Sequence, residues 1–488
     1  MNQHRVWGIA IVAASGALGC AETYTPRPAA GFAANAGPLT SAYAAAETHA
    51  DPEAGRAGTP LPPKAVELFG AETVRAGSPP GPTMNLEEIV RLAVLRDPAI
   101  RAALADVEAA KADVVRSRTL PNPTVLATQS LVPFPGRPFT EEKTGGPPQL
   151  DVILGYALDR IVFGKRGAAV ARDKLAVDAA SAAHADRIRT RVAEAVTAYV
   201  DVLQTRALWV LATEVYGHAR RLQAVTNARN GDTAAAELGR VRIYHLTTHR
   251  AVMHTAADLD SARARLRERL ALQPDEPTPE PAGFPIVDHP APPPSEEEAI
   301  REAFAARPDL EGSRRDAERA RSAVVSEKRE GLPVLGVVGI VSHQFQSQAL
   351  GAPNVWSYGF GLFGTLPVLD RNQGGIARAR ATVTLADANQ SSTALRVESE
   401  VRTALAEYRA AYQAIIEGNE GLLRGAAEMR SGIRDAYAAG AKSLVEVLDA
   451  EQAFSDAMRL EIEEEAGYIR AYHLLNAAVG RAILSSEP

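Results

Sequence analysis

The chain has 488 residues, of which 46% are hydrophobic and 23% are charged, a composition typical of folded proteins. Its formal net charge is −6, and no Lys/Arg-rich stretch with interleaved aromatic residues occurs, so the pattern excludes a nucleic-acid partner. The sequence has neither a GxxxxGK[ST] phosphate loop nor a GxSxG motif, and it predicts no enzyme and no cofactor.

Residues 1–19 have the features of a lipoprotein signal peptide. His4 and Arg5 precede an apolar run from Val6 to Leu18, which has the length of a secretory signal and is too short to span a bilayer. The run ends in small residues before Cys20, the only cysteine in the sequence. Because this segment is similar to a bacterial lipobox, we expect Cys20 to be diacylated. The alternative is a free cysteine after a conventional cleavage site.

Two segments are predicted to lack regular structure. Residues 20–83 are rich in Ala, Pro, Gly and Thr without apolar periodicity, which indicates a flexible, lipid-anchored tether. Residues 274–294 are rich in proline and are predicted to form a linker, because proline interrupts helices. These segments leave two blocks, residues 84–273 and 295–482, followed by a tail at 483–488.

The two blocks share residues at a constant spacing of 209 or 210 positions, which predicts a duplicated unit. The matched pairs are Asp97-Pro98 with Arg307-Pro308, Asn122-Pro123 with Leu332-Pro333, Tyr199 with Tyr408, and Gly231 with Gly440.

Each block is predicted to contain a helix that ends before a proline, two strands, a very long helix and a closing helix. In the first block we expect a helix at 86–119, strands at 124–131 and 150–158, and a long helix at 166–229. In the second block we expect a helix at 295–329, strands at 334–344 and 355–366, and a long helix at 375–438. The predicted fold class is therefore mainly α with a small β part.

The long helices would each extend about 95 Å at 1.5 Å per residue. Helices of this length cannot bury themselves in a compact globule, so they require lateral partners. In the first of them, apolar residues step by three or four positions, which predicts a coiled-coil-like seam rather than an all-round core. The seam consists of Ile188, Val192, Ala195, Tyr199 and Leu203.

The strands alternate between apolar residues and small or polar ones. In the last strand Trp356, Tyr358, Phe360 and Leu362 occupy every second position, a pattern typical of transmembrane β-strands. Four strands cannot close a barrel, and open strand edges are not tolerated in lipid. A homotrimer would supply 12 strands, so we expect a trimeric, 12-stranded transmembrane β-barrel. The alternative is a set of half-buried strands packed on helices in a soluble domain.

From Leu86 to Gly480 the sequence resembles the TolC-like outer-membrane efflux family. The resemblance is carried by Asn122-Pro123, by the turn from Leu366 to Gly374, and by the segment from Tyr437 to Ala450. That turn, together with Gly164-Lys165-Arg166, is most similar to the heavy-metal efflux branch represented by CzcC and CusC.

The resemblance implies duplicated long-helix hairpins that form a trimeric α-barrel, topped by the β-barrel with four strands per protomer. The implied function is that of a passive outer-membrane channel in a tripartite, RND-type efflux pump that exports small toxic solutes, with heavy-metal cations as the narrower class. The implied partners are a periplasmic adaptor, an inner-membrane RND pump and outer-membrane lipid. The protein would extend from the bacterial outer membrane into the periplasm. The alternative is a lipid-anchored periplasmic coiled-coil adaptor or scaffold, although an adaptor usually has one hairpin and this chain has two.

Two helix-reversal tips are the predicted docking sites for the adaptor. They fall where long helices must turn back, and each contains a glycine, which permits the backbone conformation of a tight turn. The first tip includes Gly231, Asp232 and Thr233, and the second consists of Gly440, Ala441, Lys442 and Ser443.

A periplasmic gate is predicted beside the second tip. Glu446 and Asp449 are three residues apart and share a helix face, so a trimer would gather six carboxylates that attract cations. The family resemblance implies an acidic ring at this place, with Glu instead of Asp at 446, and a gate-closing tyrosine at Tyr437. The alternative is that both acids face solvent on the outer wall.

Two further clusters are assigned to solvent-exposed helix faces. His245 and His249 have the i, i+4 spacing of metal ligands and His254 follows, but no third ligand occurs at a fixed spacing, so no metal site is predicted. The acidic cluster from Glu461 to Glu465 is likewise expected to be exposed.

Overall fold

The structure is a computed structural model, and it describes residues 81–132, 147–227, 234–284, 290–418 and 420–484. The described residues form two compact units. The first comprises residues 109–177 and 322–377, and the second comprises residues 81–108, 178–321 and 378–484. None of the helices in this described part combines the length and the apolar composition needed to cross a bilayer.

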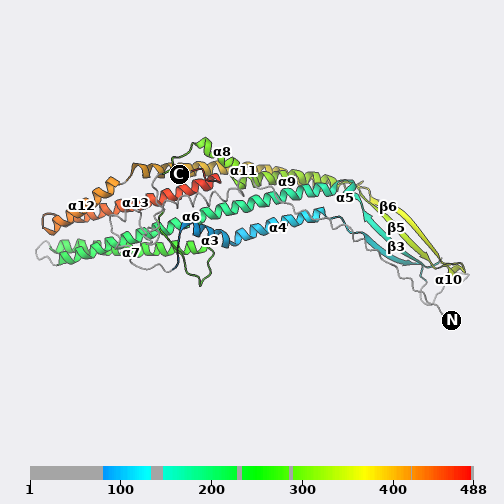
Figure 1. Cartoon of the computed structure of the whole chain (residues 1–488), viewed down its shortest axis with the longest axis horizontal. Coiled ribbons are helices and arrows are strands. Elements are labelled where there is room, and N and C mark those ends of the chain that lie inside the picture. The colour runs from blue at the N-terminus through cyan, green and yellow to red at the C-terminus, as the bar shows by residue number, and fades with distance from the viewer. Residues whose placement is uncertain (1–80, 133–146, 228–233, 285–289, 419, 485–488) are drawn as a thin grey trace. The chain divides into compact units, whose positions relative to one another are not determined.

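The first unit contains one antiparallel sheet of four strands in the order β2-β3-β5-β6 (Figure 1). The strands are β2 (Thr124–Ser130), β3 (Gln149–Ala157), β5 (Val334–Gln344) and β6 (Val355–Thr365). Each block supplies two of them, and the halves meet at the β3–β5 pair, where Tyr156 lies opposite Val337. All four predicted strands are confirmed within one residue at each end. The short helix α10 (Gln346–Leu350) joins β5 to β6.

Strand β6 presents an apolar stripe on one face of the sheet. Tyr358 and Phe360 are 81% and 87% exposed, and Trp356 and Leu362 are exposed beside them. The intervening positions include Gly359 and Gly361, so the period of two seen in the sequence corresponds to the two faces of the strand.

The first helix of each block is divided in two, whereas the sequence predicted one continuous helix. The observed helices are α3 (Leu86–Arg96) and α4 (Pro98–Arg118), then α8 (Glu296–Ala306) and α9 (Pro308–Glu330). Asp97 and Arg307 separate them in extended conformation, with ψ of 117° and 122°. A residue before proline is pushed out of the helical region, and Pro98 and Pro308 then fit the first position of a new helix.

The long helices differ between the blocks. Helix α6 (Lys165–Asn227) runs for 63 residues, which confirms the prediction, and α7 (Ala234–Arg269) closes the first block. The second long helix was predicted to be continuous, which is wrong, because it is divided into α11 (Gln373–Glu417) and α12 (Glu420–Ala438). Gly418, with φ +66°, ends α11, since glycine adopts the left-handed conformation at little cost. Helix α13 (Leu444–Val479) closes the block.

The second unit is built around a large helical core that includes residues of α6, α11 and α13. In α6, residues 198–200, 202 and 203 are all buried. The predicted single seam is therefore wrong for this stretch, because neighbours surround the helix on more than one side. The other large core residues include Val397, Val401, Leu405, Phe454, Met458 and Ile462.

Two equivalent tyrosines fix the linker to the helical core. The Tyr199 hydroxyl donates to the carbonyl of Gly283 at 3.1 Å, and the Tyr408 hydroxyl donates to the carbonyl of Ala291 at 2.6 Å. The described linker residues are not helical, as predicted. Two of them form strand β4 (Glu280–Pro281), which pairs in parallel with β1 (Thr83–Met84), a pairing that the sequence did not reveal.

The acidic cluster on α13 is partly buried, so the prediction that it is exposed is wrong. Glu461 and Glu465 are only 5% and 8% exposed. They share a helix face with Met458 and Ile462, because residues three or four positions apart lie on the same side of a helix. Their charge alone suggested that these residues face solvent. The apolar residues around them show instead that this face of α13 points inward.

Candidate functional site

The second tip is a tight turn between α12 and α13, which pack side by side (Figure 1). Gly440 has φ +80° and its N–H donates to the carbonyl of Tyr437 at 3.0 Å. The next N–H, of Ala441, donates to the carbonyl of Ala436 at 2.8 Å. These two bonds form a Schellman motif, which ends α12 and leaves residues 438–443 exposed at the turn.

The start of α13 is fixed by a capping box. The hydroxyl of Ser443 accepts from the backbone N–H of Glu446 at 3.4 Å, and the Glu446 carboxylate accepts from the Ser443 N–H at 2.9 Å. The same carboxylate accepts from Lys442 Nζ at 2.5 Å. The tip thus has a defined shape, because the turn itself supplies partners for carbonyl groups at the end of α12 and for N–H groups at the start of α13.

Glu446 remains ionised over the whole physiological range. The hydrogen bond from Lys442 lowers the pKa of Glu446 most, followed by the bonds from Ser443, and together they bring it to about 2. Asp449 lies one turn further along α13 and is exposed, and Glu446 is partly exposed. The predicted pair of acids therefore shares one face near the tip, but Lys442 compensates the charge of Glu446.

Tyr437 does not point into solvent from the protomer. It is buried, and its hydroxyl lies 3.4 Å from the hydroxyl of Thr226, which is buried near the end of α6. Tyr437 packs with Val241 of α7 and with Leu444 and Val447 of α13 in a small apolar cluster. The ends of four helices are therefore joined around this tyrosine.

Sequence reasoning missed two features of this site. The spacing Ser443 to Glu446 is the S-x-x-E signature of a capping box, which would have predicted the structural use of Glu446. Thr226 carried no signal, because a threonine inside a long helix is ordinary until its partner is known. Of the other predicted site residues, Cys20 and Gly231, Asp232 and Thr233 lie outside the described residues.

Two of the histidines of α7 contact an aromatic ring of α6. The rings of His245 and His249 each lie 5.1 Å from the ring of Tyr216 on α6. Over the described ranges, no group of three or more His, Cys, Asp or Glu side chains is arranged to hold a metal ion.

Several solved structures share the fold of this chain. The outer membrane channel CmeC of Campylobacter jejuni aligns with a TM-score of 0.65 at 16% identity, covering 83% of this chain and 87% of that one. The open-state outer membrane channel MtrE of Neisseria gonorrhoeae aligns with a TM-score of 0.64 at 18% identity, covering 82% and 90%. CusC, whose structures concern folding and transmembrane channel formation, aligns with a TM-score of 0.63 at 16% identity, covering 83% and 94%.

At these identities the structural likeness shows the fold alone, and it agrees with the mainly helical class with a small sheet. No match was found among curated proteins. The family model described as outer membrane efflux protein matches residues 299–481, which span α8 to α13 and include both the second tip and Tyr437. Residues 299–481 of the chain are therefore similar to the outer membrane efflux protein family, and the solved structures extend the likeness in fold to most of the chain.

Proposed function

We propose that this protein is the outer-membrane channel subunit of a tripartite efflux pump, and that it acts as a homotrimer. In this role it is a passive conduit for small toxic solutes, and the energy is supplied by an inner-membrane RND pump. The observation that carries the proposal is a four-stranded sheet with two open edges, attached to helices too long for a compact domain.

The open edges support a trimer. Among the residues that the structure describes, β2 and β6 each pair on one side only. Unpaired strand edges are costly in lipid, whereas three copies joined edge to edge would give a closed barrel of 12 strands. Strands β5 and β6 have 11 residues each, which is the length that spans a bilayer when the strand is tilted by about 45°.

The exposed face of β6 supports a membrane environment. Tyr358, Phe360 and Leu362 are large apolar side chains that the protomer leaves uncovered. A lipid-facing position would remove this surface from water, a gain of roughly 25 cal/mol for each Å². A contiguous apolar patch that stayed in water would favour aggregation instead.

For the tip and the anchor we propose the roles expected from the sequence. The exposed, preformed turn at residues 440–443 would dock a periplasmic adaptor, together with the first tip at residues 231–233. Glu446 and Asp449 would line the periplasmic entrance, where Tyr437 holds the helix ends together. Cys20 would carry the lipid. Growth with labelled palmitate tests this role, because the label should enter the wild-type chain and not the variant Cys20→Ala.

Heavy-metal cations are the narrower substrate class that we propose. The support is the resemblance of the turn from Leu366 to Gly374 to the heavy-metal branch, and the likeness in fold to CusC. Resistance to copper, zinc and cobalt salts in a strain that lacks the gene would separate this class from organic drugs. A deletion that changes drug resistance alone would remove the metal assignment.

The channel function is tested with protein purified from outer membranes. A heat-labile band at three protomers' mass, with stepwise conductance in planar bilayers, is the expected result. A monomer that enters no bilayer and crosslinks only to an inner-membrane pump would instead indicate an adaptor or scaffold.

A further inference from the structure

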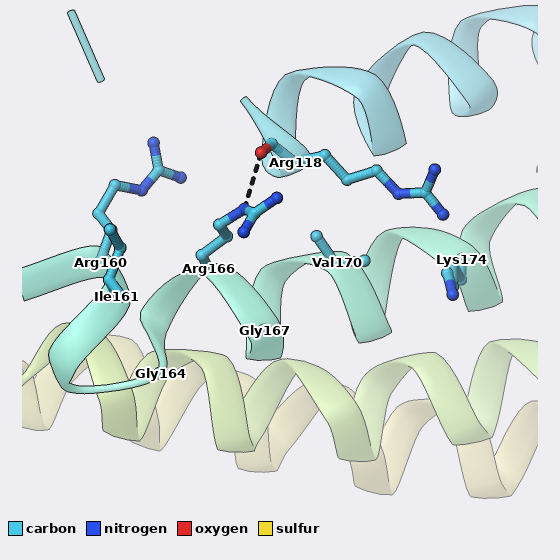
Figure 2. A pocket seen from close by; sticks show the side chains of 8 residues that line it. All are labelled: Arg118, Arg160, Ile161, Gly164, Arg166, Gly167, Val170 and Lys174. Carbon is cyan, nitrogen blue, oxygen red and sulfur yellow. Dashed lines mark hydrogen bonds between the residues drawn. The ribbon is translucent and has the colours of Figure 1, made fainter. Parts of the chain in front are cut away.

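A basic pocket of about 470 Å³ lies in the first unit, where β3 leads through a short helix into α6 (Figure 2). The short helix is α5 (Asp159–Val162). The pocket borders the end of the sheet at which β2 begins and β3 ends. It is lined by Arg118, Arg160, Ile161, Gly164, Arg166, Gly167, Val170 and Lys174.

Four of these eight lining residues are cations, and none is an acid. Arg118 comes from the end of α4, Arg160 from α5, and Arg166 and Lys174 from α6. Arg166 and Lys174 share one face of α6, because Val170 lies between them at steps of four residues. Figure 2 shows the side chains of all four cations around α5 and the first turns of α6.

The elements that line the pocket are joined by two contacts. One involves residues outside the lining, and the other joins two lining residues. Lys165 forms a buried ion pair with Asp159 at 2.8 Å, which joins α6 to α5 and neutralises the nearby carboxylate. Arg166 Nε donates to the carbonyl of Arg118 at 2.7 Å, as the dashed line in Figure 2 marks. Gly164 has φ +67° and makes the turn between the two helices. The cations are therefore gathered before any ligand arrives.

Apolar side chains lie beside the cations. Ile161 and Val162 follow Arg160 directly and are both more than half exposed. Exposed aliphatic groups next to Arg and Lys are typical of surfaces that meet the head-group region of a bilayer.

The second block has a pocket at the corresponding place with the opposite charge. It lies between the end of α9 and the turn after β6, and its charged lining residues are Glu327, Glu330 and Asp370, with no Lys or Arg. The fold itself thus does not require cations at this position. Of these two pockets, only the one in the first block has a basic lining.

We propose that the basic pocket binds the phosphate group of an anionic phospholipid in the leaflet that meets this end of the sheet. The proposal rests on the membrane position given under Proposed function. Guanidinium groups bind phosphate oxygens through paired hydrogen bonds. An anionic head group carries no positive charge that the cations of the pocket would repel. A zwitterionic head group would bring an ammonium group toward four cations, so the pocket should prefer phosphatidylglycerol to phosphatidylcholine.

The test counts lipids retained by the full chain in neutral detergent, by native mass spectrometry, after mixing with phosphatidylglycerol or phosphatidylcholine. The variant Arg160→Gln with Lys174→Gln should retain phosphatidylglycerol at least about tenfold more weakly than wild type. The matched control, Lys328→Gln with Arg371→Gln, removes the same charge from exposed positions near the second pocket and should behave as wild type. Equal retention by variant and control would overturn the proposal.

A second variant fills the pocket without removing a cation. A Cβ atom at Gly167 would meet no atom within 4 Å, so Gly167→Glu can fold and would place a carboxylate among the cations. Gly374→Glu is the control, because Gly374 also lies near the start of a long helix with open space around it. Only Gly167→Glu should lose bound phosphatidylglycerol. The proposal is wrong if both variants retain the lipid or if both lose it.

Inorganic phosphate distinguishes the two sources of the ligand. We expect 10 mM phosphate to leave phosphatidylglycerol bound, because the lipid also contacts Ile161 and Val162. Complete displacement by phosphate would assign the site to free phosphate and overturn the lipid. Conductance in phosphatidylcholine bilayers tests the channel function separately. If the wild-type protein does not conduct, the proposed function is wrong, but the experiment in detergent still measures lipid binding in the pocket.

Discussion

Asp97 and Arg307 occupy equivalent positions in the two blocks, each buried before a proline, and they form ion pairs of opposite polarity. Asp97 accepts from Arg191 of α6, whereas Arg307 donates to Glu400 of α11 at 2.6 Å and to Asp309 at 2.7 Å. Arg191 and Glu400 are themselves equivalent by the spacing of 209 residues. The same helix junction is thus fixed twice, with the charges exchanged.

We expect the first of these pairs to tolerate reversal but not loss of one partner. Asp97→Asn removes the buried carboxylate that accepts from Arg191 and leaves this buried guanidinium with only the partly exposed Glu194, 3.2 Å away, so the free energy of unfolding should fall by about 3 kcal/mol. Asp97→Arg with Arg191→Glu copies the polarity of the second block and should recover at least half of that loss. Denaturant unfolding of the purified chain measures both. If the variant with the reversed pair is as unstable as Asp97→Asn, the two charges cannot be exchanged at this junction.

The same carboxylates predict acid sensitivity. Burial alone would raise the pKa of Asp97, but the hydrogen bond from Arg191, the N–H of Ala99 and nearby guanidinium charges hold it below 3.8. Asp309 is held below 3.8 in the same way by Arg307. Because the folded pKa is depressed, the stabilisation is present above pH 3.8 and is lost as the pH falls through the folded value. Unfolding measured between pH 5 and pH 3 should therefore show a smaller loss of stability in Asp97→Asn than in wild type. Identical slopes would exclude Asp97 as a source of the effect.

Elements with a clear periodic pattern of apolar residues were predicted from the sequence. Features that depend on a single residue or a single contact were missed. The strands were placed within a residue because alternation marks both faces of β6, and α6 was placed because its alanine-rich pattern has no break. The division of the second long helix at Gly418 was missed because one glycine in an alanine-rich run is a weak signal. Charge exchange between Asp97 and Arg307 was invisible, since the blocks were matched through their prolines.

The docking role that we propose for the second tip predicts a selective assembly defect. Ala441→Glu adds a charge at the exposed turn without disturbing the Schellman bonds, which use backbone atoms. Adaptor crosslinking and resistance in cells should be lost, while the trimer stays intact on a gel. Ser431→Glu adds the same charge to an exposed position of α12 and should leave assembly unchanged. Normal crosslinking by Ala441→Glu would place the adaptor elsewhere.

If Glu446 and Asp449 line the entrance as proposed, their removal should change ion selectivity, and salt should screen the effect. Glu446→Gln with Asp449→Asn removes two charges per protomer but keeps an acceptor at 446 for the capping box. Block by trivalent cations and cation selectivity should both weaken in single-channel recordings. The difference from wild type should shrink at 1 M salt, where the Debye length is about 3 Å. Glu428→Gln with Asp435→Asn is the control on the exposed surface of α12. Block as strong as wild type would place both acids on the outer wall.

If Tyr437 is part of the proposed periplasmic gate, its contact with Thr226 should help to hold the gate closed. Tyr437→Phe removes the hydroxyl that meets Thr226 and should raise the resting conductance, because a buried hydrogen bond contributes on the order of 1 kcal/mol. Thr226→Val should have the same effect, since it removes the other partner and keeps the volume. If this bond is responsible, the double variant will conduct like either single variant, and the coupling energy from the cycle will equal the single effect. Additive effects would mean that Tyr437 acts through another contact, and unchanged conductance in all three variants would remove Tyr437 from the gate.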